Sequence, residues 1–154
     1  MTYENLLAEA HDENISVIEN APFKSESNGL ISGNVIGLNK KIRSTRKRAC
    51  TLSEELGHYH TTVGNIINQS SAAERKQEHR ARVWAFEKMV GLTGIIKCYE
   101  HECHTLYEMA EYLEITEDFL SEALRYYKSR YGICTTVDNY VIYFEPSIGV
   151  FELI

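Results

Sequence analysis

The sequence predicts an α+β fold in which a mainly helical core carries a small antiparallel sheet and is followed by a helix-turn-helix-like segment and a C-terminal β-hairpin. Three observations predict it. Apolar residues recur at helical spacing in several long segments. Two turn signals, Gly33-Asn34 and Asp138-Asn139, each lie between short apolar runs. Residues 105–124 have the spacing of two short helices around a tight turn.

The length of 154 residues suits one domain with a small appendage. We expect residues 1–95 to form the core, residues 96–130 the helix-turn-helix-like segment, and residues 131–154 a hairpin packed on the core. The net charge of −6 argues against direct binding of nucleic acid, which usually needs a basic surface. No apolar run approaches the ~20 residues of a membrane span, and the start of the chain lacks signal-peptide features. We therefore expect a cytoplasmic protein whose cysteines are reduced thiols.

The first part of the chain is predicted to alternate helix, hairpin and helix. Residues from about 3 to 20 carry a helical apolar stripe, with a break near residues 12–14 left open, and residues 29–39 form a hairpin. The basic run 40–48 is interpreted as a solvated loop and first helical turn, with a nucleic-acid patch as the alternative. Either Ser44 or Thr45 would cap the helix that follows.

Helices and strands are also predicted further along. Gly64 and residues 68–71 make a loop, and a long helix runs from about 72 to 90. Gly91 and Gly94 separate it from a short helix near 95–101. The expected strands are 133–137, 140–144 and 150–154.

The helix-turn-helix-like segment has Ala110 inside its first helix, Ile115 in its turn and Thr116 as the cap of its second helix. In a DNA reader the second helix offers Arg, Asn or Gln to the groove. Here its start is acidic, so we expect the shape without binding of DNA. The acidic residues are Glu117, Asp118 and Glu122.

The segment Leu52–His60 contains the pattern that carries chemistry. Glu54 and His58 are four residues apart, so on a helix both side chains converge on one point, with Glu55 beside it. Zinc peptidases use this geometry in the pattern H-E-x-x-H, with two ligands at i and i+4 and a glutamate that activates water. A catalytic metal needs a third protein ligand, and the second long helix offers Glu78.

Spacing alone leaves other interpretations open. Two glutamates on an amphipathic helix are usually a solvated face, and E-E-x-x-H has low specificity as a pattern. A second cluster of potential soft-metal ligands fits no standard site. Its members are Cys98, His101, Cys103 and His104.

Taken together, the chain resembles the ImmA/IrrE family of metallopeptidases. The resemblance covers nearly all of it. Residues 29–39 look like the hairpin that precedes the family's metal helix, and Glu54–His58 aligns with that helix's H-E-L-G-H core. Residues 78–85 resemble the second motif, in which a glutamate is followed by alanine, an aromatic residue and alanine. Residues 107–127 resemble the helix-turn-helix-like region that follows.

The resemblance implies a zincin-like minimal peptidase core. It implies that Glu54, His58 and Glu78 are the metal ligands and that Glu55 is the catalytic general base. It also implies the partner: a helix-turn-helix transcriptional repressor of a phage or mobile element, which the protein binds and cleaves. Zn²⁺ is the cofactor that the family uses.

One departure separates this chain from the family pattern, because Glu54 stands where the first histidine of the motif is expected. A carboxylate can hold zinc, but it adds a negative charge that weakens the metal as a Lewis acid and makes the site harder. Mn²⁺ or Fe²⁺ then competes with Zn²⁺. Two hypotheses follow: a metal-dependent peptidase that cleaves its repressor, or a non-catalytic antirepressor of the same fold that binds the repressor without cleaving it.

Overall fold

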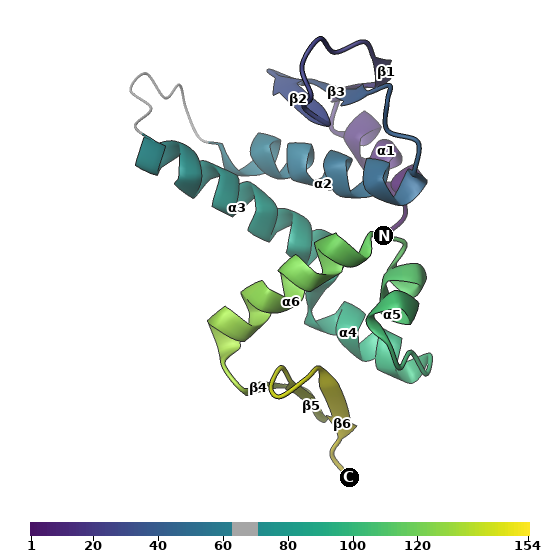
Figure 1. The fold of residues 1–154 in the computed structure, drawn as a ribbon, viewed down its shortest axis with the longest axis vertical. Coiled ribbons are helices and arrows are strands. Elements are labelled where there is room, and N and C mark those ends of the chain that lie inside the picture. The colour runs from purple at the N-terminus through teal and green to yellow at the C-terminus, as the bar shows by residue number, and fades with distance from the viewer. Residues whose placement is uncertain (63–70) are drawn as a thin grey trace. The chain divides into compact units, whose positions relative to one another are not determined.

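A computed structural model describes residues 1–62 and 71–154. The chain folds as two compact units, residues 1–85 and residues 86–154 (Figure 1). The expected boundaries at residues 95 and 130 stay a prediction. The loop predicted at Gly64 and residues 68–70 lies outside the described residues. In the described ranges, no helix is long and apolar enough to cross a membrane.

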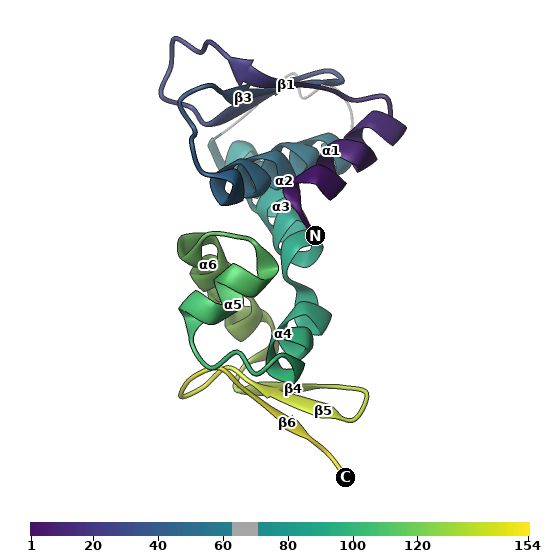
Figure 2. The same ribbon diagram turned by 90° about the vertical axis from the view of Figure 1, so that its right-hand side faces the viewer.

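The first unit combines helices with a three-stranded sheet. Its elements are α1 (Tyr3–Asp12), β1 (Ser16–Ala21), β2 (Gly29–Ser32), β3 (Val35–Asn39), α2 (Thr45–Thr61) and most of α3 (Ser71–Met89). The hairpin, the cap at Ser44 and the two long helices are as predicted. Figure 2 shows α1 and α2 against one face of the sheet.

The N-terminal helix is shorter than predicted. It ends at Asp12, and Asn14 takes a left-handed backbone conformation with φ of 60°. The β-branched residues Val17 and Ile18 then lie in β1, where such side chains are favoured. The helix ends at the break left open near residues 12–14, but the helical pattern expected to continue to residue 20 was wrong, because residues 16–21 form a strand.

The extra strand changes the sheet. The order is β1-β3-β2, with β1 parallel to β3 and β2 antiparallel to β3. The sheet is mixed rather than antiparallel as predicted, because β1 adds to the expected hairpin. Strand β2 is at the edge of the sheet in this order, and among residues 1–62 and 71–154 no strand pairs with its outer side.

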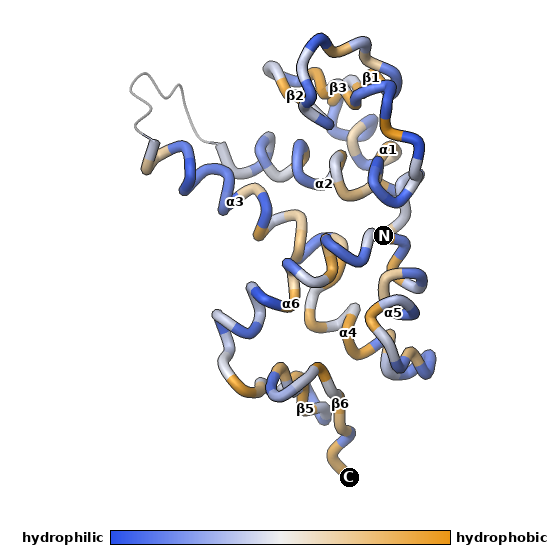
Figure 3. Tube along the Cα trace, in the orientation of Figure 1, coloured by the Kyte–Doolittle hydropathy of each residue, from blue (hydrophilic) through white to orange (hydrophobic). Residues whose placement is uncertain are grey.

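The two helices that carry the candidate site differ in character. Helix α2 buries an apolar face in the interior of the unit, which includes Leu52 and Leu56. The N-terminal half of α3 is hydrophilic, as Figure 3 shows, and Ala81 and Ala85 bury a small-residue face further along. Small residues let α3 approach another helix closely.

The second unit packs helices on another three-stranded sheet. Its elements are α4 (Gly91–Glu100), α5 (Leu106–Leu113), α6 (Glu117–Tyr131), β4 (Cys134–Val137), β5 (Tyr140–Tyr143) and β6 (Gly149–Glu152). The antiparallel sheet has the order β4-β5-β6, in which the expected hairpin is joined by the last strand expected at residues 150–154. Helices α5 and α6 flank a three-residue turn, and Thr116 caps α6 as predicted.

Gly91 and Gly94 play different parts. Gly91 has φ of 64°, a conformation that interrupts the helical path after α3. Gly94 lies inside α4, where the missing side chain leaves ordinary contact distance to Leu113. The helix therefore begins earlier than predicted, and only the first glycine marks a break. The buried hydroxyl of Tyr127 ties this junction together by donating to Phe86 O and accepting from Gly91 N.

Candidate metal centre

The beginning of α2 is fixed by local hydrogen bonds. Ser44 caps the helix by accepting from Lys47 N at 3.2 Å. Within the basic run, the Arg48 guanidinium donates to Ile42 O and to Asn20 Oδ1. These bonds give Arg48 a structural part in holding the strand–helix connection. The following turns of α2 lie beneath the sheet, and the fixed start of the helix sets their rotation about the helix axis.

Backbone contact brings α2 and α3 together at Gly57. A side-chain carbon added there would lie 2.3 Å from the carbonyl oxygen of Ala81, far inside contact distance. The two helices run in opposite directions on either side of the undescribed residues (Figure 1). Only glycine fits this crossing, and the crossing sets which turns of α2 and α3 face one another.

The four predicted site residues all line one pocket. It has a volume of about 440 Å³ and is lined by Glu54, Glu55 and His58 of α2 and by Glu78 of α3. His58 Nε2 lies 3.2 Å from Glu78 Oε1, so the structure joins this pair across the two helices. The Glu78 side chain is 65% exposed and the His58 side chain 20%, which places the pair at the mouth of the pocket.

Two of the carboxylates in the pocket, Glu54 and Glu55, have a raised pKa. Burial is the largest cause of the raised pKa of Glu55, which reaches about 7, and the charges of Glu54 and Glu78 add to it. Burial also raises the pKa of Glu54, against which the positive charge of Arg82 acts. A carboxylate whose pKa is near 7 can exchange a proton with water at neutral pH.

The donor set suits a divalent cation. Two ligand atoms bound tetrahedrally at the usual zinc distances are roughly 3.3–3.4 Å apart, close to the 3.2 Å between His58 Nε2 and Glu78 Oε1. A cation would also offset the repulsion among the three carboxylates. Glu54 lines the same pocket, but in residues 1–62 and 71–154 no three His, Cys, Asp or Glu side chains are gathered closely enough to hold a metal ion. Coordination by all three therefore requires the Glu54 carboxylate to move toward the pair.

The other wall of the pocket comes from residues that the sequence analysis did not single out. Asn28, Gly29, Leu30 and Ile31, at the start of β2, face the metal helix across the pocket, together with Ser27 and with Thr51 of α2. A side-chain carbon at Gly29 would lie 3.0 Å from both Glu55 Cγ and Glu55 Oε1. The absence of a side chain there lets the backbone approach Glu55. The sequence feature that could have indicated this wall of the pocket is Gly29, a glycine that precedes a short apolar run.

His60 lies outside the pocket and has a different role. Its ring stacks on Trp84 of α3 at 4.9 Å between centroids, and its Nε2 lies 2.9 Å from Glu13 Oε2 at the end of α1. These contacts join α1, α2 and α3. His60 is therefore engaged outside the pocket that contains His58.

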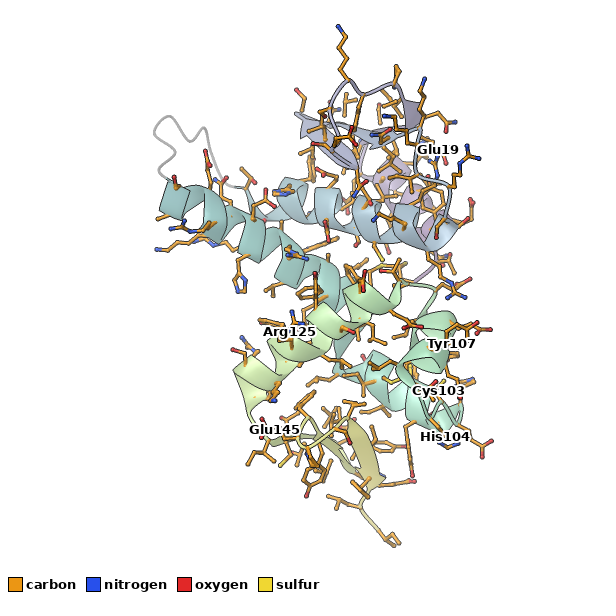
Figure 4. The ribbon with its side chains drawn as sticks, viewed as in Figure 1. Glu19, Cys103, His104, Tyr107, Arg125 and Glu145 are labelled. Carbon is orange, nitrogen blue, oxygen red and sulfur yellow. The ribbon has the colours of Figure 1, made fainter. Side chains whose placement is uncertain are left out.

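The second cysteine–histidine cluster surrounds the end of α4, where Cys103 and His104 lie on the following loop (Figure 4). Its side chains have separate partners: Cys103 Sγ donates to Glu108 O at 3.7 Å, and the His101 ring packs on Tyr112. Burial, followed by the neighbouring Cys103, raises the pKa of the Cys98 thiol to about 12, which disfavours the thiolate that binds metals.

Comparison with known families adds independent information. The family model of the M78 peptidases, described as the IrrE N-terminal-like domain, matches residues 4–125. The match spans α1 to most of α6 and includes every residue of the candidate site. No curated protein matches the chain. Because the match extends over most of the sequence and over the pocket, the chain belongs to the M78 (ImmA/IrrE) family, which is a family of metallopeptidases.

Proposed function

We propose that this protein is a metal-dependent endopeptidase with a zincin-like core that binds and cleaves a helix-turn-helix repressor of a phage or mobile element. The observation that carries the proposal is the pocket in which Glu54, Glu55, His58 and Glu78 meet, with His58 Nε2 3.2 Å from Glu78 Oε1. The family match supports the peptidase chemistry. The repressor as substrate follows from the family resemblance.

In this proposal Glu54, His58 and Glu78 hold the ion. A bound divalent cation supplies Lewis-acid activation of water and of the scissile carbonyl. The extra carboxylate makes the donor set harder than two histidines and one glutamate, so Mn²⁺ and Fe²⁺ are expected to compete with Zn²⁺. The closeness of His58 to Glu78 places two donors before any ion arrives.

Glu55 is the general base. Its carboxylate takes the proton of the attacking water and returns it to the nitrogen of the leaving amine. The pKa of about 7 suits this double role, because the group is then neither a permanently ionised nor a permanently protonated acid at neutral pH. The absence of a side chain at Gly29 leaves room for this carboxylate.

The substrate is expected to bind as an extended segment along β2. That strand lines the pocket at Gly29, Leu30 and Ile31, and in the described part of the chain no strand pairs with its outer edge. An extended chain can add to such an edge through main-chain hydrogen bonds. A loop or linker of a repressor provides such a segment, whereas residues inside a folded helix do not.

The test is incubation of the purified protein with the helix-turn-helix repressor encoded next to it, with Zn²⁺, Mn²⁺ or chelator. We expect cleavage with metal, loss of cleavage with chelator, and loss of cleavage in Glu55→Gln with binding retained. An exposed glutamate on the same unit, Glu74, provides the control variant Glu74→Gln. A stable complex that contains no metal and shows no cleavage would support the non-catalytic antirepressor instead.

A further inference from the structure

A carboxylate at position 54 raises an electrostatic question. Glu54, Glu55 and Glu78 lie in one pocket, and when all three are ionised they bring three negative charges to it. One divalent cation balances only two of them. The family's usual set of two histidines, one ligand glutamate and one catalytic glutamate would bring only two negative charges. Something near Glu54 must offset the extra charge if the ionised form is to be held there.

The helix crossing places Arg82 in that position. His58 of α2 contacts Glu78 of α3, and Gly57 meets the backbone at Ala81. Glu54 lies one turn before His58, and Arg82 lies one turn after Glu78. Because α2 and α3 run in opposite directions (Figure 1), the register of these two contacts puts the turn of Glu54 opposite the turn of Arg82.

Burial and charge agree with this placement. Glu54 and Arg82 are both partly buried, so their charges are less screened than those of a surface pair. Among the charged neighbours that act on Glu54, Arg82 has the largest effect and favours the ionised carboxylate. By contrast, the neighbouring charges that act on Glu55 are the carboxylates of Glu54 and Glu78. The arginine is thus directed to the one residue that departs from the family pattern.

We propose that Arg82 is a positioning residue that compensates the charge of Glu54 and orients its carboxylate when it moves to coordinate the metal. With Arg82 included, the pocket carries two net negative charges, which one divalent cation balances. A carboxylate has two oxygens, so Glu54 can direct one to the guanidinium and the other to the ion. Groups that hold a ligand in this way often change metal affinity 10–100-fold when removed. This inference rests on the proposed function for the metal, but the pairing of Glu54 with Arg82 does not.

The pairing is tested first in metal-free protein, by thermal unfolding of Arg82→Met, Glu54→Gln and the double variant in chelator. We expect Arg82→Met to lower Tm by about 3–6 °C in the wild-type background and by less than about 2 °C in Glu54→Gln. Arg82→Lys should retain part of the effect, and 1 M salt should reduce it. The control is Arg80→Met, an exposed arginine of α3 that should act equally in both backgrounds.

Metal affinity is the second readout, measured by titration with Zn²⁺ and Mn²⁺ alone. We expect Arg82→Met to weaken binding about 10–100-fold in the wild-type background and less than about 3-fold beside Glu54→His, which removes the extra charge. Equal Tm losses in both Glu54 backgrounds would overturn the pairing. If pairing is seen but wild type binds no metal, the proposed function fails and the electrostatic assignment of Arg82 stands, whereas metal binding insensitive to Arg82 overturns its role toward the ion.

Discussion

The raised pKa of Glu55 makes the stability of the metal-free protein depend on pH in a defined direction. The group holds its proton in the folded protein up to about pH 7 but loses it near its ordinary value of 4.5 when unfolded. Between these values the folded state binds more protons, so this group's contribution to stability falls as pH rises. It is fully present below about pH 4.5 and is lost by about pH 8. Glu55→Gln removes the titration and should remove this fall.

The size of the effect follows from the same values. One pKa unit corresponds to about 1.4 kcal/mol, so the difference between 4.5 and about 7 corresponds to roughly 3 kcal/mol. Glu55 is partly exposed, and solvent screening reduces the expected gain to about 2 kcal/mol. For a chain of this length that is a rise in Tm of about 4–8 °C.

The assay is thermal unfolding of wild type and Glu55→Gln in chelator from pH 4.5 to 8.5. We expect the difference in Tm between them to be small at pH 4.5, to grow through pH 5–7 and to level off above pH 8. Glu74→Gln, at an exposed position, should show no such growth. A constant difference across the range would refute the burial and charge repulsion assigned to Glu55.

Other predictions concern the glycines and the junction of α3 with α4. Gly57→Ala should destabilise the protein by about 1–3 kcal/mol and weaken metal binding, because its side chain would meet a backbone oxygen of α3 at 2.3 Å; in Gly94→Ala, the matched control, unfolding should show unchanged or higher stability, because the added carbon has ordinary contacts. Gly29→Ala should strongly reduce the rate of repressor cleavage while it lowers Tm only slightly, because the added carbon displaces Glu55 and the edge of β2. Repressor binding is compared in Gly29→Ala and in Glu55→Gln/Gly29→Ala; an equal loss of binding affinity in both would show that the effect is on binding rather than on the chemical step. Tyr127→Phe should lower the free energy of unfolding by about 1–2 kcal/mol, since the buried Gly91 N–H loses its acceptor, while Phe86 O still accepts from Val90 N. Denaturant unfolding that showed no change would contradict this.

Much of the fold was predictable because local signals agreed with tertiary structure. The hairpin turn at Gly33, the cap at Ser44 and the cap at Thr116 each use a residue type whose chemistry acts within three or four residues. Such features need no knowledge of the rest of the chain. The α+β class and the long helices followed from them and from apolar periodicity.

The errors came from features that depend on distant partners. Strand β1 pairs in parallel with β3, and residues 16–21 contain no local sequence signal that indicates this partner. Its apolar residues also fit a helical period, so the helix was extended too far. Gly94 looked like a helix break, but its helix is held by packing against Leu113 rather than by intrinsic propensity.

The site was predictable as a set of residue types but not as a geometry. The spacing of Glu54 and His58 placed two side chains on one helix face, and the family resemblance supplied Glu78 from another helix. The close crossing at Gly57 and the proposed pairing of Glu54 with Arg82 depend on how α2 and α3 pack, which spacing does not encode. The approach of Gly29 to Glu55 likewise requires the sheet to be placed over α2.

The most direct test of the central claim is anomalous diffraction from crystals soaked in Zn²⁺ or Mn²⁺. The proposal predicts one anomalous peak in the pocket, about 2.0–2.2 Å from His58 Nε2 and from a carboxylate oxygen of each of Glu54 and Glu78. The peak should disappear in His58→Ala. An ion bound elsewhere on the chain, or an ion in this pocket that Glu54 and Glu78 do not coordinate, would contradict the assignment of the metal centre.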